Sequence, residues 1–159
     1  MTTLEILSNV DFLEAYPAED LLAWAYDQAK DRAALVTSFQ HTGCVMIDMI
    51  SHHHIPLRVV TVDTLRLHRE TYEVIDQIEQ RYGIRVERFT PERTLLDEMI
   101  RTDGEFLFFD SKAKQEKCCY VRKVEPMRRV LETLDIWITG LRRDQNTTRA
   151  ETPKAKWVS

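Results

Sequence analysis

The chain has 159 residues, 43% of them hydrophobic and 30% charged, which is typical of one globular domain spanning residues 1–159. Since no apolar run of about 18 residues occurs, we expect no membrane span. The formal net charge of −4 argues against nucleic-acid binding, which needs a broad basic surface. The three cysteines and the acidic start of the chain argue against a secreted disulfide framework and favour a cytoplasmic location.

The predicted elements alternate along the chain. Strand-forming runs occupy residues 34–39, 57–63, 84–89 and 136–140, and helical patterns occupy residues 19–31, 43–53, 68–82, 92–102 and 124–134. Residues 103–117 indicate a loop with an apolar centre, and residues 150–159 an exposed tail. Strands that alternate with helices at this spacing predict an α/β fold with a parallel, twisted sheet flanked by helices.

Ligands of such folds bind beyond the carboxyl ends of the strands. This rule indicates three polar or cationic segments, Ser38–Cys44, Asp63–His68 and Gly140–Arg149. In the first, hydroxyls, one glycine and the free N–H groups of a helix start are typical of a phosphate site. The segment matches neither GxxxxGK[ST] nor GxGxxG, and an ordinary helix start with Thr42 as N-cap is the alternative.

The other two segments also allow two interpretations each. Asp63 and Thr64 can bond a ribose or base, and Arg66 and His68 can meet an anion. The alternative is that Thr64 or Asp63 merely caps the helix. The cluster of Arg142, Arg143 and Arg149 can grip phosphate or sulfate with its guanidinium forks, or it is a solvated charged loop.

Two further groups of metal-ligating residue types favour structural roles. Three consecutive histidines, His52–His54, point about 100° apart on a helix and cannot chelate one ion together, so we expect a polar helix end. Cys44 is predicted to be a small buried residue.

Cys118 and Cys119 are adjacent, and the segment around them is cationic. Residues 112–129 hold 7 basic and 2 acidic side chains, a difference of +5, whereas residues 1–80 hold 5 basic and 13 acidic ones, a difference of −8. Neighbouring thiolates can reach different irons of one cluster, and nearby cations stabilise such an anionic group. The alternatives are incidental structural thiols, or thiols made reactive by a lowered pKa.

Taken together, these motifs resemble one family. The run CCYVRKVEP at 118–126 resembles the Cys-Cys-x-x-Arg-Lys-x-Glu-Pro signature of the assimilatory sulfonucleotide reductases, in the iron–sulfur branch that reduces adenylyl sulfate (APS). VDTLRLHRETY at 62–72 resembles that family's Leu-Asp-Thr-Gly-Arg-Leu-His-Pro-Glu-Thr-Tyr, and GLRRDQNTTR at 140–149 its Gly-x-Arg-Arg-x-Gln segment with a later arginine. TSFQHTGCVMIDM at 37–49 stands where the family has a modified pyrophosphate loop.

The resemblance implies the adenine-nucleotide α-hydrolase-like fold. It implies reduction of APS, or of its 3′-phosphorylated relative PAPS, to sulfite and AMP or PAP, with electrons from a thioredoxin-type dithiol. It also implies that Cys118 and Cys119 are two ligands of a [4Fe–4S] cluster that faces a nucleotide pocket, with Lys123 as the catalytic cation between cluster and substrate.

The same resemblance assigns the substrate-binding residues. Along the phosphate and ribose it places Ser38, Phe39, Gln40, Thr42 and Gly43; beside the nucleotide, Asp63, Thr64 and Arg66; and on the sulfate and phosphate, Arg142, Arg143 and Arg149.

The chain departs from the family pattern in identifiable places. It has neither the second cysteine pair that completes the cluster nor the family's terminal nucleophilic cysteine, so we expect a partial chain of an APS reductase. A non-catalytic nucleotide-binding module, a PAPS reductase, or a homo-oligomer whose two chains share a cluster are the alternatives. Gln40 and Leu65 stand where glycines are expected, and Arg69 where a proline is expected.

Overall fold

The computed structural model describes residues 9–158. Its α-helices are α2 (Ala18–Ala29), α3 (His41–His52), α4 (Arg69–Tyr82), α5 (Arg93–Asp103), α6 (Lys112–Cys119) and α7 (Glu125–Glu132). Its strands are β1 (Ala33–Val36), β2 (Arg58–Val62), β3 (Val86–Phe89) and β4 (Ile136–Ile138). Short 3₁₀ turns are η1 (Asp11–Ala15), η2 (Lys30–Arg32), η3 (Leu107–Phe109), η5 (Arg143–Gln145) and η6 (Thr147–Arg149), and η4 (Tyr120–Val124) is a π-helical turn.

The four strands form one parallel sheet in the order β3-β2-β1-β4. The chain therefore moves outward from β1 through β2 to β3 and then returns to the other side of β1. In an open α/β sheet this reversal of direction is the topological switch point, and ligands bind beside it, beyond the carboxyl ends of the strands. Here the switch point lies between β1 and β4.

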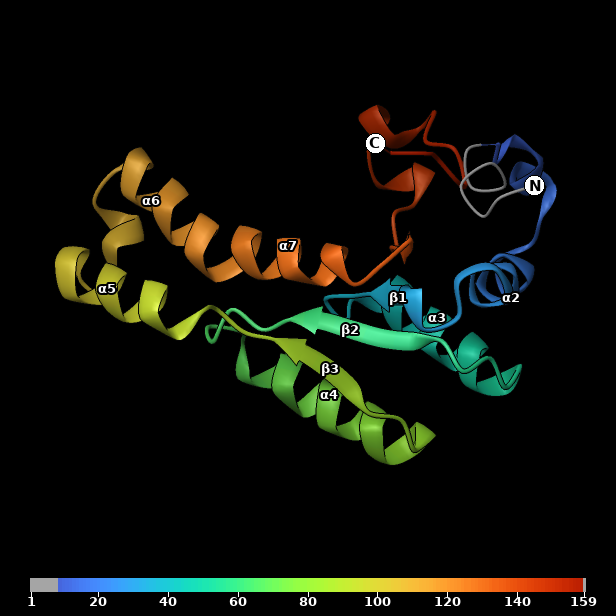
Figure 1. Ribbon diagram of the computed structural model, residues 1–159, viewed down its shortest axis with the longest axis horizontal. Coiled ribbons are helices and arrows are strands. Elements are labelled where there is room, and N and C mark those ends of the chain that lie inside the picture. The colour runs from blue at the N-terminus through green and yellow to red at the C-terminus, as the bar shows by residue number, and fades with distance from the viewer. Residues whose placement is uncertain (1–8, 159) are drawn as a thin grey trace.

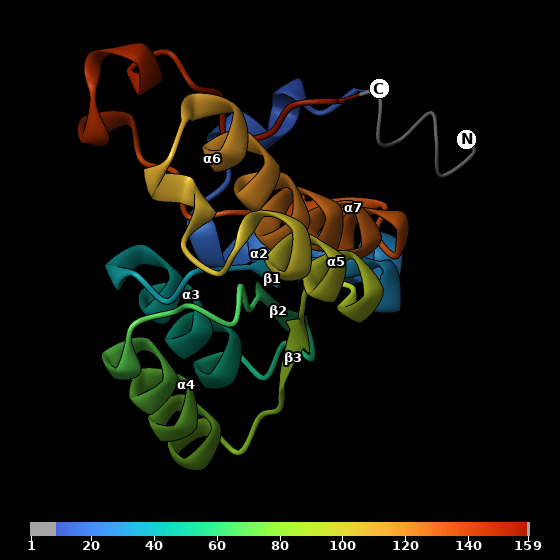
Figure 2. The same ribbon diagram turned by 90° about the vertical axis from the view of Figure 1, so that its left-hand side faces the viewer.

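Helices cover both faces of the sheet, as Figures 1 and 2 show. On one face Leu35 and Val59 pack with apolar residues of α2, α3 and α4 in the main core cluster. On the other face Ala34 and Val60 pack against Val130 of α7. Since neighbouring residues of β1 and of the middle of β2 are buried on opposite faces, these two strands are apolar almost throughout. The edge strands β3 and β4 leave Arg88 and Trp137 exposed.

An ion pair helps to fix the alignment of β2 and β3. Arg58 and Glu87 lie on these neighbouring strands, and the guanidinium donates through Nε at 2.8 Å and through Nη2 at 3.0 Å to the two carboxylate oxygens. A two-point contact of this geometry is directional, so it favours one register of the two strands.

Two sequence-based boundaries are wrong. Residues 112–117 are not a loop, because a helix begins after Ser111, whose hydroxyl accepts from the Lys114 amide at 3.2 Å, and continues through the π turn into α7. The pattern was undetectable because α6 has no apolar stripe. The strand predicted at 34–39 stops at Val36, because Thr37 Oγ1 accepts from the Phe39 amide and Phe39 has φ 61°.

The segment after β4 returns to the beginning of the described chain. The Lys154 amide donates to Glu14 Oε2 at 2.9 Å, and Lys154 Nζ donates to the Tyr16 carbonyl at 2.7 Å. The tail at 150–158 is largely exposed apart from half-buried Thr152 and Ala155. Within residues 9–158, no helix has the length and apolar character needed to cross a bilayer.

Candidate functional site

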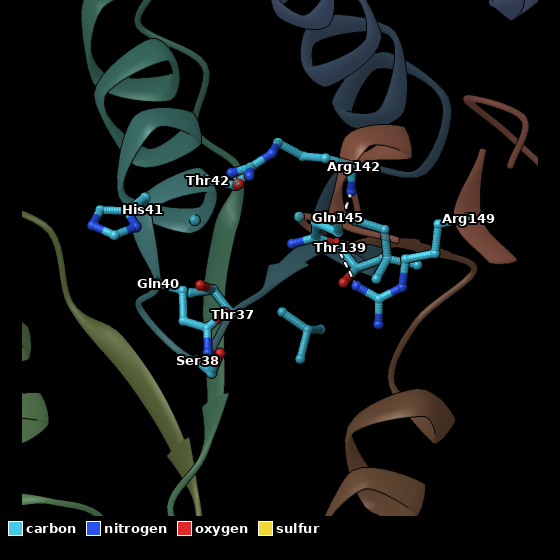
Figure 3. A pocket seen from close by; sticks show the side chains of 13 residues that line it. Thr37, Ser38, Gln40, His41, Thr42, Thr139, Arg142, Gln145 and Arg149 are labelled. Atoms are coloured by element: carbon cyan, nitrogen blue, oxygen red, sulfur yellow. Dashed lines mark hydrogen bonds between the residues drawn. The ribbon is translucent and has the colours of Figure 1, made fainter. Parts of the chain in front are cut away.

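A polar cavity of about 310 Å³ lies at the switch point, between the ends of β1 and β4 and the start of α3 (Figure 3). The lining residues are Val36, Thr37, Ser38, Gln40, His41, Thr42, Gly43, Thr139, Gly140, Leu141, Arg142, Gln145 and Arg149. Its position is the one that the strand order alone would select for a ligand.

Two glycines allow the walls of this cavity to approach one another. A Cβ on Gly43 would lie 2.0 Å from Thr37 Oγ1, so only glycine lets the first turn of α3 pack against the end of β1. A Cβ on Gly140 would lie 3.2 Å from Thr42 Cβ and 3.4 Å from Met46 Cε. The segment after β4 therefore lies directly against α3.

The start of α3 presents unoccupied backbone donors to the cavity. Gln40 is the N-cap with φ −73° and ψ 168°, and no side chain caps the first-turn amides of this 12-residue helix. The alternative in which Thr42 is the N-cap is therefore wrong. Free amides and the positive end of the helix dipole together favour an anion, and the hydroxyls of Ser38 and Thr42 add hydrogen-bonding partners.

Arg142 extends across the cavity to α3, as Figure 3 shows. Its Nη1 donates to Thr42 Oγ1 at 3.0 Å, and its Nε donates to Asp144 Oδ1 at 2.9 Å. The hydrogen bond from Arg142 holds the pKa of Asp144 below its ordinary value. The guanidinium is thus held at the rim by a hydroxyl and an exposed carboxylate.

Gln145 orients the other cavity arginine. Its Oε1 accepts from the Arg142 amide at 3.1 Å and also from Arg149 Nη1, which places the Arg149 guanidinium on the cavity wall opposite Ser38 and Gln40 (Figure 3). Two guanidinium groups and the start of α3 give this cavity a cationic character suited to phosphate or sulfate.

Arg143 points away from the cavity. Its Nη2 donates to Glu14 of η1, and its Nε donates to the Thr152 carbonyl at 2.8 Å. These bonds hold the guanidinium beside η1. The structure therefore places two of the three predicted arginines at the cavity and gives the third a structural contact.

The turn after β2 is not part of the cavity lining. Asp63 is buried, and its Oδ1 accepts from the Leu65 amide at 2.8 Å and from the Tyr72 hydroxyl at 2.7 Å. Burial raises the pKa of Tyr72, and the bond to Asp63 raises it further. Thr64 Oγ1 accepts from the Arg66 amide at 3.2 Å. We call residues 63–66 the Asp63 turn; because β2 is next to β1, it lies at the same edge of the sheet as the cavity.

Leu65 occupies the position where the family resemblance predicts a glycine, and it has φ 60°. A left-handed conformation costs a residue with a Cβ about 1–2 kcal/mol. The neighbouring Arg66 lies over the rings of Phe106 and Phe108 and donates to the Glu105 carbonyl at 2.6 Å. Its guanidinium is therefore committed to the segment around η3 and is directed away from the cavity lining.

The two adjacent cysteines differ in their surroundings. Cys118 is 8% exposed and packs with Met99, Leu107 and Val121, whereas Cys119 is exposed. Neither lines the cavity, which differs from the expectation that both face a nucleotide pocket. Their successive positions on a helix turn their side chains about 100° apart, and this divides the pair between core and solvent.

A four-thiolate iron–sulfur cluster requires more ligands than the described residues bring together. Residues 9–158 contain no group of three or more His, Cys, Asp or Glu side chains placed to hold a metal ion. Cys118 and Cys119 are half of such a donor set, and the third cysteine, Cys44, belongs to α3. The described residues therefore do not fit a complete cluster.

Cys44 and Phe39 have structural roles. Burial raises the pKa of the Cys44 thiol, whose Sγ donates to the Phe39 carbonyl at 3.4 Å, so the group is held unionised. The Phe39 side chain is buried in the main core, and Phe39 is not among the residues that line the cavity, which differs from its predicted binding role. His52 ends α3 and His53 is its C-cap, in agreement with a polar helix end.

The sequence identified part of the cavity and missed part of it. Of the predicted binding residues, those that line it are Ser38, Gln40, Thr42, Gly43, Arg142 and Arg149. His41 and Gln145 lie inside the segments that the strand-end rule selects, and Gln145 is the glutamine of the Gly-x-Arg-Arg-x-Gln segment, but neither was predicted to bind the substrate. Thr37 and Thr139 directly follow β1 and β4, so correct strand ends would have revealed them.

Comparisons with known proteins identify the family of the chain. The phosphoadenosine phosphosulfate reductase domain family matches residues 32–157. The adenosine 5'-phosphosulfate reductase of Allochromatium vinosum is 38% identical over 127 residues, which are 80% of this chain and 50% of that protein. The protein of the same name from Agrobacterium fabrum is 40% identical over 126 residues, 79% of this chain and 48% of that protein.

A solved structure shows the same fold. The phosphoadenylyl-sulfate (PAPS) reductase of Candida auris, crystallised as a phosphate complex, superimposes with a TM-score of 0.71 at 24% identity and covers 86% of this chain and 68% of that one. An α/β fold of the adenine-nucleotide α-hydrolase type with a cationic cavity at its switch point is the class that the geometry defines. The chain belongs to the phosphoadenosine phosphosulfate reductase domain family. It spans about half the length of the curated relatives given above.

Proposed function

We propose that this chain is the nucleotide-binding part of an adenylyl-sulfate reductase. In the reaction, two electrons from a thioredoxin-type dithiol reduce the sulfur of APS, so that sulfite and AMP are released and the dithiol becomes a disulfide. The observation that carries the proposal is the cavity between β1 and β4, which joins a glycine-packed helix start to Arg142 and Arg149. The relatives named adenosine 5'-phosphosulfate reductase support the choice of substrate.

The division of work within the cavity follows from its chemistry. The free amides at the start of α3, with the hydroxyls of Ser38 and Thr42, suit the α-phosphate, which is present in both APS and AMP. Arg142, whose Nη1 reaches Thr42 at the start of α3, suits this phosphate as well, and Arg149 suits the second anionic group, the sulfate of APS. The Asp63 turn follows the neighbouring strand at the same edge of the sheet, and we assign it to the ribose or the base.

The nucleophile and the electron donor are proposed to meet the substrate from outside this cavity. Cys44 is unsuited to attack on sulfur because its thiol is held unionised and bonded to a backbone carbonyl. We assign Lys123, which is exposed on the π turn directly after the cysteines, the role of an electrostatic contact to the substrate.

Cys118 and Cys119 are proposed as two iron ligands, completed by thiolates from beyond residues 9–158 or from a second copy of the chain. When bound, a cluster of this kind would supply a local electrostatic field and redox-active iron. The test is the iron content and the broad absorbance near ~400 nm of anaerobically purified protein. Cys118→Ser should remove both and Cys44→Ser should leave them; iron unchanged by Cys118→Ser would remove the assignment.

The nucleotide proposal is tested by titrating the chain with AMP, APS and PAP in a calorimeter. We expect AMP and APS to bind and PAP to bind at least about tenfold more weakly, since no further cationic group is assigned to a 3′-phosphate. Tighter binding of PAP than AMP would favour a PAPS reductase. Binding of AMP with no sulfite formed from APS and a dithiol, in the chain extended to the length of its relatives, would favour a non-catalytic nucleotide-binding module.

A further inference from the structure

Arg122 is a buried cation whose charge is not neutralised within the described chain. Its side chain is 6% exposed, and its Nε has no hydrogen-bond partner. Its one hydrogen bond runs from Nη1 to the Thr64 carbonyl at 2.9 Å. Among residues 9–158, no carboxylate pairs with this guanidinium, although burying a charge without a partner is strongly unfavourable.

The π-helical turn brings Arg122 to this position. Residues 120–124 interrupt the helix that runs from α6 into α7 directly after Cys119, and Val121 and Arg122 are the buried residues of the turn. A π turn inserts an extra residue into a helix, so it rotates the side chains that follow. In Figures 1 and 2 this long helix lies along one face of the sheet, opposite α3 and α4.

The segment that Arg122 contacts needs to be held in place. Leu65 is in the left-handed region with φ 60°, a conformation that persists only when its surroundings impose it. Within the Asp63 turn the amides of Leu65 and Arg66 bond to the preceding side chains, and these local bonds alone do not tie the turn to the rest of the molecule. Tyr72 holds it from α4, and Arg122 holds it from the opposite side of the sheet.

If the side chain at position 122 only filled space, an uncharged residue there would make the folded protein at least as stable. An apolar residue of similar volume avoids the desolvation of a guanidinium and commonly packs with equal or greater stability. The donor that Arg122 provides to the Thr64 carbonyl is what an apolar residue would lack. The buried guanidinium is therefore explained by what it does to the turn.

We propose that Arg122 is a positioning residue that holds the Asp63 turn in its nucleotide-binding conformation and thereby links the cysteine-bearing helix to the nucleotide side of the sheet. The assignment rests on the proposed function in one respect, since it takes the turn to contact the nucleotide. The contact itself, between segments 58 residues apart in the sequence, is independent of the substrate.

The test compares Arg122→Met and Arg122→Lys with Arg128→Met, which removes an exposed charge from the same long helix. Three quantities are measured for each protein: urea unfolding, hydrogen exchange of the Leu65 and Arg66 amides, and AMP affinity. For Arg122→Met we expect unchanged or higher resistance to urea, at least about tenfold faster exchange of both amides, and about tenfold weaker AMP binding. The lysine variant keeps one donor and should be intermediate, and Arg128→Met should match the wild type.

The proposal is overturned by wild-type exchange at Leu65 and Arg66 in Arg122→Met, or by acceleration spread evenly over the sheet, which would mean general destabilisation. If Arg122→Met does not fold, wild-type exchange at both amides in Arg122→Lys overturns it equally. Failure of the proposed function has a different signature. In that case the wild type itself does not bind AMP, while the amide exchange of the variants still decides the role of Arg122.

Discussion

The cavity at the switch point and the segment that carries Cys118 and Cys119 differ in how many of their expected ligand-binding groups the described residues bring together. The cavity is lined by the ends of β1 and β4, the start of α3 and the segment after β4, and two glycines and the bond from Arg142 to Thr42 hold these parts together. The cysteine segment packs one thiol into a small apolar cluster and leaves the other in solvent. The comparison teaches that the described residues line a cavity with donors for an anion, whereas they supply only two adjacent thiols toward a four-thiolate cluster.

Gly43→Ala should have the largest effect on the cavity. The new Cβ would overlap Thr37 Oγ1, and a shift of Thr37 would break its bond to the Phe39 amide. We expect the free energy of unfolding to fall by about 1–3 kcal/mol, together with loss of AMP affinity, measured by urea unfolding and calorimetry.

Gly83→Ala is the control for that experiment. Gly83 ends α4 with φ 62° and nothing within 4 Å of an added Cβ, so alanine there introduces backbone strain without a collision. This variant should lose stability and keep its AMP affinity. Equal losses of affinity in both variants would show that the effect of Gly43→Ala is general destabilisation.

The different exposure of Cys118 and Cys119 should give the two thiols different rates of alkylation. With iodoacetamide at neutral pH, exposed Cys119 should react at least about tenfold faster than Cys118, which is buried among Met99 and Leu107. Cys44 should also react slowly, because burial raises the pKa of its thiol. Mass spectrometry of digested samples over time measures all three rates, and equal rates for Cys118 and Cys119 would contradict the division.

These two regions also show what could be read from the sequence. The alternation of strands and helices along the chain, with polar segments after the strands, predicted a ligand at the sheet edge. This was possible because strand hydrophobicity and strand-end chemistry are local properties. The opposite directions of Arg142 and Arg143 depend on contacts with Thr42 and Glu14, which are distant in sequence. The helix at 112–119 escaped because α6 has no apolar stripe, and the burial of Arg122 follows from a π turn that no spacing rule predicts.

The smallest expected effect concerns Glu14, beside the segment that follows the cavity. The hydrogen bond from Arg143, followed by that from the Lys154 amide, lowers the pKa of Glu14 below its ordinary value of 4.5. A carboxyl whose pKa is lowered on folding contributes stability that is present above the unfolded pKa and lost as the pH falls through the folded pKa. Protection of the Lys154 amide from exchange should therefore be intact at neutral pH and lost well below pH 4.5.

Glu14→Gln provides the control for this titration, because glutamine keeps the shape of the side chain and does not ionise. After correction for the intrinsic pH dependence of exchange, the Lys154 amide of this variant should show weaker protection that does not change over the same range. If the wild type and the variant lose protection in parallel, another group is responsible for the titration.

AMP titration of Arg142→Ala and Arg143→Ala tests the central claim most directly, because the two arginines are adjacent in the sequence and only the first lines the cavity. Loss of a charge-assisted bond of about 1.5–3 kcal/mol predicts roughly ten- to hundredfold weaker AMP binding for Arg142→Ala. Arg143→Ala should stay within about twofold of the wild type. Unchanged affinity in Arg142→Ala, or a larger loss in Arg143→Ala, would contradict the placement of the nucleotide between β1 and β4.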